Sequence, residues 1–148
     1  INAVGLSSFS TSADCGNSFH ARQNIQDMAA GKYPAVCSPS CSCKAGGSSG
    51  SITVNPALLD GLKALRNRGI IFTTTSLTTG KHSPGSSHYS GHGVDFVIGN
   101  NNPAVWAEAR TFLNSLGGDA FCETAGGQRD SDCSPISQGN VDHIHWTR

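Results

Sequence analysis

Charged residues are scarce in this sequence, and charge of neither sign is concentrated anywhere. They make up 14% of the 148 residues, Lys plus Arg and Asp plus Glu number 10 each, and no run of five or more basic residues occurs. Proteins that bind nucleic acid or anionic membranes by electrostatic attraction carry basic patches. We therefore expect neither nucleic acid nor a membrane surface as a partner.

Long apolar runs are missing as well. No stretch approaches the roughly 20 apolar residues that span a bilayer, and no charged-then-apolar leader opens the sequence. The sequence thus predicts no transmembrane helix, and Ile1 is expected to be a processed, mature N-terminus. The length suits one hydrophobic core. We expect residues 1–148 to form a single monomeric domain, with residues 1–50 packed on a core formed by residues 51–148.

Cysteine is present six times, among many Ser, Thr, Gly and Asn residues. An even cysteine number in this composition is typical of exported proteins, so the sequence predicts a secreted, disulfide-stabilised chain. Cys122 and Cys133 could close a short loop. The four others could then form two bridges of undetermined pairing: Cys15, Cys37, Cys41 and Cys43. The alternative is a structural zinc site at the last three of these, although no second Cys/His pair follows at a zinc-finger interval.

Hydrophobic periodicity and capping residues predict three helices, within residues 20–31, 55–69 and 102–117. Alternating or β-branched stretches predict four strands, at residues 51–54, 70–75, 93–98 and 141–146. This order favours an α+β domain with a small, mostly antiparallel sheet and flanking helices. The Gly/Ser run at residues 45–50 resembles a linker between two domains. The segment before it is too short for a core of its own, so we expect an internal loop.

Four of the six histidines lie in two tight groups. Residues 86–95 read Ser-Ser-His-Tyr-Ser-Gly-His-Gly-Val-Asp, and residues 142–146 read Asp-His-Ile-His-Trp. Side chains alternate faces along a strand, so His143 and His145 should emerge on the same side. Together with His88 and Asp95 they would offer nitrogen and oxygen ligands suited to zinc.

A catalytic zinc takes three protein ligands and leaves one position for water, so these four groups are one more than the metal requires. The spare imidazole could act as the base on the bound water, which predicts hydrolysis of an amide. His92 is left out, because Gly91 and Gly93 disfavour the helix that would pair it with His88. Ser-His-Asp catalysis is the alternative chemistry, but the sequence lacks a Gly-x-Ser-x-Gly elbow.

The first histidine group resembles the Ser-x-His-x-x-Gly-x-Ala-x-Asp motif of the D-alanyl-D-alanine carboxypeptidase-like metallopeptidases. This group includes lysostaphin-type peptidases and the zinc domain of hedgehog proteins, and the C-terminal His-x-His completes the resemblance. Gly93 stands where the family usually has Ala, and the similarity covers residues 70–145. The resemblance implies the family's fold and zinc site. It also implies that His88, Asp95 and His145 bind the zinc and that His143 is the catalytic histidine.

The resemblance also implies a secreted peptidase that cleaves peptides of bacterial peptidoglycan, as a carboxypeptidase or an endopeptidase. Family members often place an arginine upstream of the motif to hold the substrate, yet residues 78–83 contain none, which favours an endopeptidase. Lys81 or His82 could take this role, and His82 is the better candidate because imidazole suits an oxyanion contact. Glu123 could contact metal-site groups or substrate, or be an exposed loop residue. The alternative function is a non-catalytic, hedgehog-like zinc-binding interaction module.

Overall fold

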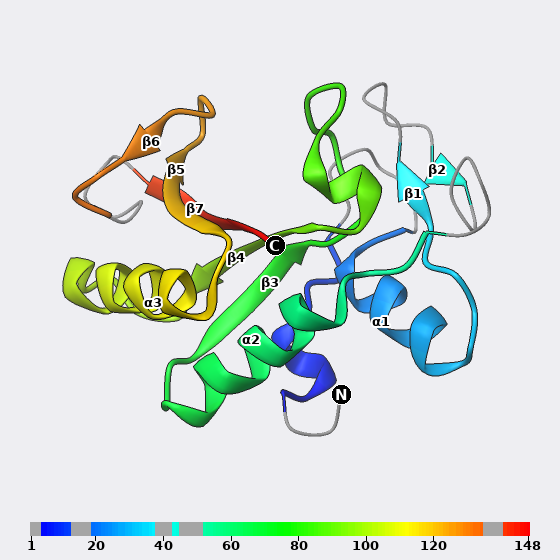
Figure 1. Ribbon diagram of the computed structural model, residues 1–148, viewed down its shortest axis with the longest axis horizontal. Coiled ribbons are helices and arrows are strands. Elements are labelled where there is room, and N and C mark those ends of the chain that lie inside the picture. Colours follow the sequence, from blue (N-terminus) through cyan, green and yellow to red (C-terminus); the bar gives the residue numbers. More distant parts are fainter. Residues whose placement is uncertain (1–3, 13–18, 38–42, 45–51, 135–140) are drawn as a thin grey trace.

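A five-stranded antiparallel sheet organises the computed structural model, which describes residues 4–12, 19–37, 43–44, 52–134 and 141–148 (Figure 1). The strand order is β3-β4-β7-β5-β6, and every neighbouring pair is antiparallel. The strands are β3 (Phe72–Ser76), β4 (Gly93–Ile98), β5 (Asp119–Thr124), β6 (Arg129–Asp130) and β7 (Val141–Thr147). A two-stranded sheet of β1 (Val36–Cys37) and β2 (Cys43–Lys44) lies apart from it.

Three helices accompany the sheet: α1 (Ala21–Ala29), α2 (Pro56–Asn67) and α3 (Pro103–Leu116). The latter two begin alike, because Asn55 and Asn102 each accept a hydrogen bond from the backbone N–H two residues later, with proline at the first helical position. Figure 1 shows α2 and α3 together below the sheet. Two short 3₁₀ helices, η1 (Leu6–Ser8) and η2 (Ser87–Ser90), complete the elements.

The two faces of the sheet differ in character, as β7 illustrates. Ile144 and Trp146 are wholly buried in the core, whereas the alternating residues His143 and His145 are only half-buried on the other face. The Trp146 ring packs directly against Gly61 of α2, where the missing side chain leaves room for it. The central strand therefore carries core residues toward the helices and histidines toward the opposite side.

We predict that Gly61→Ala destabilises the protein, although Ala favours helices by up to about 1 kcal/mol over Gly. A Cβ at position 61 would overlap the Cη2 and Cζ3 atoms of the Trp146 ring. Overpacking of a well-packed core costs about 1–3 kcal/mol, so the net free energy of unfolding should fall. Urea denaturation measures this, with Asp60→Ala on the exposed side of α2 as the control. An unchanged midpoint for Gly61→Ala would show that the ring is not held against the helix.

The α+β class, the antiparallel sheet and the three helices are confirmed. The Cys122–Cys133 disulfide is also confirmed. Cys37 is disulfide-bonded, so a zinc-thiolate site that uses its sulfur is wrong. No helix in the described ranges is both long and apolar enough to cross a bilayer.

The predicted strand at residues 51–54 is wrong where the structure describes it, since residues 52–54 belong to no strand of either sheet. They lead into α2 instead, and Val54 is buried in the core. Sequence analysis also missed β5 and β6. The proposed loop at residues 45–50 lies outside the described residues.

Candidate metal centre

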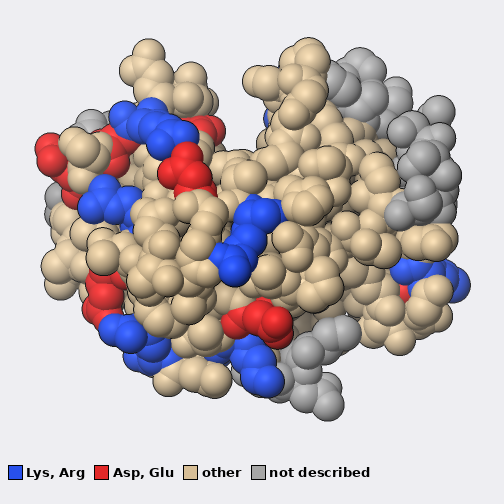
Figure 2. Space-filling model, in the orientation of Figure 1, with Lys and Arg blue, Asp and Glu red and all other residues tan. Residues whose placement is uncertain are grey.

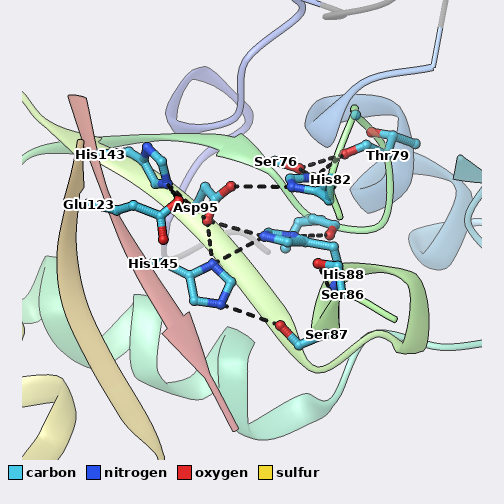
Figure 3. Close-up of polar contacts among 12 residues, drawn as sticks. Ser76, Thr79, His82, Ser86, Ser87, His88, Asp95, Glu123, His143 and His145 are labelled. Atoms are coloured by element: carbon cyan, nitrogen blue, oxygen red, sulfur yellow. Dashed lines mark hydrogen bonds and ion pairs between the residues drawn. The ribbon is translucent and has the colours of Figure 1, made fainter. Parts of the chain in front are cut away.

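Three different elements bring His88, Asp95 and His145 together. His88 lies on η2, while Asp95 on β4 and His145 on β7 are direct partners in the strand register. The Oδ1 atom of Asp95 is 3.1 Å from His88 Nε2 and 2.7 Å from His145 Nδ1 (Figure 3). The two imidazole nitrogens are 3.3 Å apart. Tetrahedral zinc with bonds of 2.0–2.1 Å separates its ligand atoms by roughly 3.3 Å, so the three atoms are spaced as ligands of one ion.

Hydrogen bonds on the far side of each imidazole fix which nitrogen faces Asp95. Nδ1 of His88 donates to the carbonyl oxygen of Leu77 at 2.6 Å, which leaves Nε2 facing Asp95. Nε2 of His145 contacts the hydroxyls of Thr147 at 2.8 Å and Ser87 at 3.3 Å, so its Nδ1 faces the centre. Such outer contacts orient metal-binding histidines in proteins.

The charges of this cluster are strongly coupled. Burial alone would raise the pKa of Asp95, but the neighbouring His88 charge and hydrogen bonds from both imidazoles hold it well below its usual range. Burial likewise opposes protonation of His88, but the Asp95 carboxylate outweighs it and raises the His88 pKa. Asp95 is therefore ionised at neutral pH. A metal ion would compete with the proton that His88 otherwise shares with this carboxylate.

His82 supplies a further nitrogen at the edge of the cluster. Its ring stacks on His88 with 3.8 Å between centroids, and Nδ1 is 4.0 Å from Asp95 Oδ2. His82, His88 and Asp95 form a group whose ligand atoms lie within 4.8 Å of one another and could hold a metal ion. This group overlaps the predicted set of ligands. His145 Nδ1 approaches the Asp95 carboxylate to 2.7 Å, closer than the 4.0 Å of His82 Nδ1, so it is the better placed third candidate ligand.

The protonation of His82 limits what it can do. Nε2 lies 2.8 Å from the Ser76 hydroxyl, which donates its own proton to the Thr79 carbonyl, and 3.2 Å from that carbonyl. Both oxygens can therefore only accept from it, so Nε2 carries the proton and Nδ1 has a free lone pair. Burial, with the nearby His88 charge, lowers the pKa of His82 to about 4. At neutral pH its free nitrogen is therefore an acceptor or a metal ligand. This arrangement does not favour the expected oxyanion contact, which needs a donor.

His143 lies next to the three candidate ligand atoms, and its two ring nitrogens contact different carboxylates. It pairs directly with Glu123 of β5 in the strand register, and its Nε2 is 3.4 Å from Glu123 Oε1 and 3.7 Å from Asp95 Oδ1. Its Nδ1 contacts the carboxylate of the preceding residue, Asp142. Glu123 thus belongs to a strand that faces the cluster and is not an isolated loop residue.

The side chains of this centre line a cleft of about 850 Å³. One wall consists of residues 81–88, and the other of residues 123–127 together with β7. The hollow is visible at the upper edge of the molecule in Figure 2, between the part formed by β5 and β6 and the part that precedes β4. Lys81 is the single lysine or arginine among the described residues that line it. His92 lies elsewhere, exposed, with Nδ1 2.6 Å from the carbonyl oxygen of Arg148.

The residues that hydrogen-bond to the outer nitrogens of His88 and His145 were not predicted from the sequence. Alternation along β7 places Thr147 on the face of His145, so its hydroxyl could have been anticipated. Ser87 and the Leu77 carbonyl depend on the path of the segment between β3 and η2, which no sequence pattern specifies. Comparisons of the chain with family models, with curated proteins and with solved structures gave no match.

Proposed function

We propose that this protein is a secreted zinc peptidase of the D-alanyl-D-alanine carboxypeptidase-like kind that hydrolyses peptide bonds of bacterial peptidoglycan. One observation carries the proposal: His88 Nε2, Asp95 Oδ1 and His145 Nδ1 lie within 3.3 Å of one another at the base of a cleft. Two neutral imidazoles and one carboxylate are a common ligand set of catalytic zinc. Disulfides at Cys37 and between Cys122 and Cys133 support export.

The residues around the ligands suit general acid–base chemistry. Zinc, when bound, polarises a carbonyl and lowers the pKa of its water toward about 7. His143 directs Nε2 toward the cluster, so it can accept a proton there and return it to a leaving amine. The Asp142 carboxylate contacts Nδ1 and would hold the ring in this orientation. Glu123, opposite His143, faces the same space.

The charge of the cleft supports cleavage within a peptide over removal of its C-terminal residue. A carboxypeptidase needs a cation near the reacting bond to bind the free carboxylate of its substrate. Lys81 is the sole candidate among the described lining residues, whereas Glu123 and Asp142 line the wall next to His143. These two carboxylates would repel a terminal carboxylate. The endopeptidase alternative is therefore favoured.

A second candidate is the non-catalytic, hedgehog-like zinc-binding interaction module. Its supporting observation is that His82 belongs to the group able to hold a metal. If His82 Nδ1 joined His88, Asp95 and His145 as a fourth ligand, the site would be closed, as structural zinc sites are. The two functions differ in whether one coordination position of the zinc remains open for water.

Release of new amino groups from purified peptidoglycan tests the proposal. The zinc-loaded protein should release them, a chelator should abolish the release, and added zinc should restore it. His145→Ala, which removes one ligand, is the matched inactive control. Cleavage of a C-terminally amidated peptide as fast as its free acid would identify an endopeptidase. A protein that binds zinc tightly yet releases nothing would support the interaction module instead.

A further inference from the structure

The segment that follows β3 supports two of the histidines through its backbone. The Leu77 carbonyl accepts a hydrogen bond from His88 Nδ1 at 2.6 Å. Two residues later, the Thr79 carbonyl accepts from His82 Nε2 at 3.2 Å and from the Ser76 hydroxyl at 2.5 Å, and this hydroxyl is also 2.8 Å from His82 Nε2. Leu77 and Thr79 lie beyond the end of β3, so no strand ladder fixes their position. The orientation of both imidazoles therefore depends on what holds residues 77–79.

Helix α1 and the residues after it hold that segment. The side chain of Asn24 is wholly buried, and its Oδ1 accepts from the backbone N–H of Thr78 at 3.3 Å and from the Thr79 hydroxyl at 3.4 Å. Its Nδ2 donates to the Ala35 carbonyl at 3.4 Å, and the Thr78 hydroxyl donates to the same carbonyl at 2.6 Å. The backbone N–H of Cys37 donates to Thr78 O at 3.2 Å.

These contacts leave little freedom, because their groups are shielded from water. Asn24, Ala35 and Thr78 have no exposed surface, and Thr79 is 3% exposed. A buried polar group that loses its partner is left unsatisfied at a cost in free energy, so the segment cannot shift without breaking contacts that water does not replace. Residues 24–37 contact this segment through atoms other than the two carbonyl oxygens that face His88 and His82.

We propose that residues 24–37 are required for tight metal binding at the centre, with Asn24 and Thr78 as positioning residues. They fix Leu77 and Thr79, whose carbonyls set the orientation of His88 and His82. This inference rests on the metal centre proposed above. It does not depend on peptidase activity, because it concerns the affinity of the site for the metal. It also gives a role to a region in which sequence analysis found no functional motif.

Thr78→Val is the sharpest test, because valine has the shape of threonine but cannot donate to Ala35. Zinc affinity of the native protein, measured by competition with a chelator, should fall by about 10-fold, the lower end of the loss caused by removing outer partners of metal ligands. The visible spectrum of the Co²⁺-loaded protein should change as well. Thr78→Ser keeps the hydroxyl and should restore both readouts.

Thr74→Val is the matched control. Thr74 of β3 is equally buried, but its hydroxyl has no hydrogen-bond partner among the described residues. This variant should bind zinc as the parent does. Leu113→Ala, in the core at α3, supplies a folded but destabilised reference that should also keep parental affinity.

The outcomes separate the two proposals. A parent protein that binds no zinc would overturn the proposed function together with this inference. Parental zinc affinity in Thr78→Val would overturn the positioning role alone. An equal loss of affinity in Thr78→Val and Leu113→Ala would also overturn it, because affinity would then follow general stability.

Discussion

His143→Gln should lower the turnover of a peptide substrate by roughly 10²-fold or more, the scale of losing a general acid or base. Nε2 of His143 is 3.7 Å from Asp95 Oδ1, beside the three ligand atoms and not among them. Zinc affinity should therefore stay close to that of the parent. Glutamine fills similar space and can form hydrogen bonds, but it cannot accept and return a proton. Steady-state kinetics and metal analysis on the same preparation measure both properties.

The parent should show a bell-shaped pH profile, because the reaction needs one group in its basic form and another in its acidic form. His143→Gln should lose or displace one limb. His92→Gln is the control, since His92 is exposed and contacts Arg148 O away from the cleft. If His143→Gln retained the parental rate and profile, the base would have to be sought elsewhere. Glu123 would be the first candidate, because its carboxylate faces the same space at 3.4 Å from His143 Nε2.

Asp95→Asn should abolish high-affinity zinc binding and, with it, activity. Asp95 Oδ1 is the atom that the other candidate ligands share, at 3.1 Å from His88 and 2.7 Å from His145. The substitution preserves shape but removes the negative charge that a divalent cation requires. The loss should exceed the 10–100-fold typical of outer-shell changes, because the substitution alters a proposed metal ligand itself. Isothermal titration with zinc measures it.

Asp142→Asn is the matched control for the loss of one negative charge in the cleft. Asp142 contacts His143 but none of the three ligand atoms in the described structure, so this variant should keep zinc and lose turnover. His82→Ala and His145→Ala then decide between the overlapping ligand sets. Zinc loss in His145→Ala alone identifies the open, catalytic arrangement. Equal zinc loss in both variants would identify a closed site. Parental zinc affinity in Asp95→Asn would show that the Asp95 carboxylate is not a metal ligand.

The parts of the fold that were predicted correctly are those with strong local patterns. Alternation identified β4 and β7 and placed Asp95 and the two histidines on the face opposite the core. The missed strand β5 has no comparable pattern. Its place in the sheet comes from pairing with β7, while the disulfide at Cys122 links it to Cys133. The stretch before α2 has β-branched residues but no strand beside it, so propensity alone misled there.

Details of the centre depended on tertiary packing and were less predictable. Gly93, which stands where the resembling metallopeptidase motif usually has alanine, has a physical reason that only the structure provides. A Cβ at this position would lie 2.5 Å from Ser87 Oγ and 2.9 Å from the His88 backbone nitrogen. Glycine therefore permits η2 to lie close to β4. The weakest sequence-based assignment was His82, whose available nitrogen is set by the Thr79 carbonyl.

The central position of β7 links the site to the unfolding of the whole domain. This strand lies between β4 and β5, so its backbone hydrogen bonds on both sides must break before it can leave. Its departure would expose Trp146 and remove His143 and His145 in the same event. Amides in such strands exchange with solvent only through global opening. The protein should therefore lose its site all at once, with no long-lived form in which the sheet persists while these two histidines have separated from Asp95.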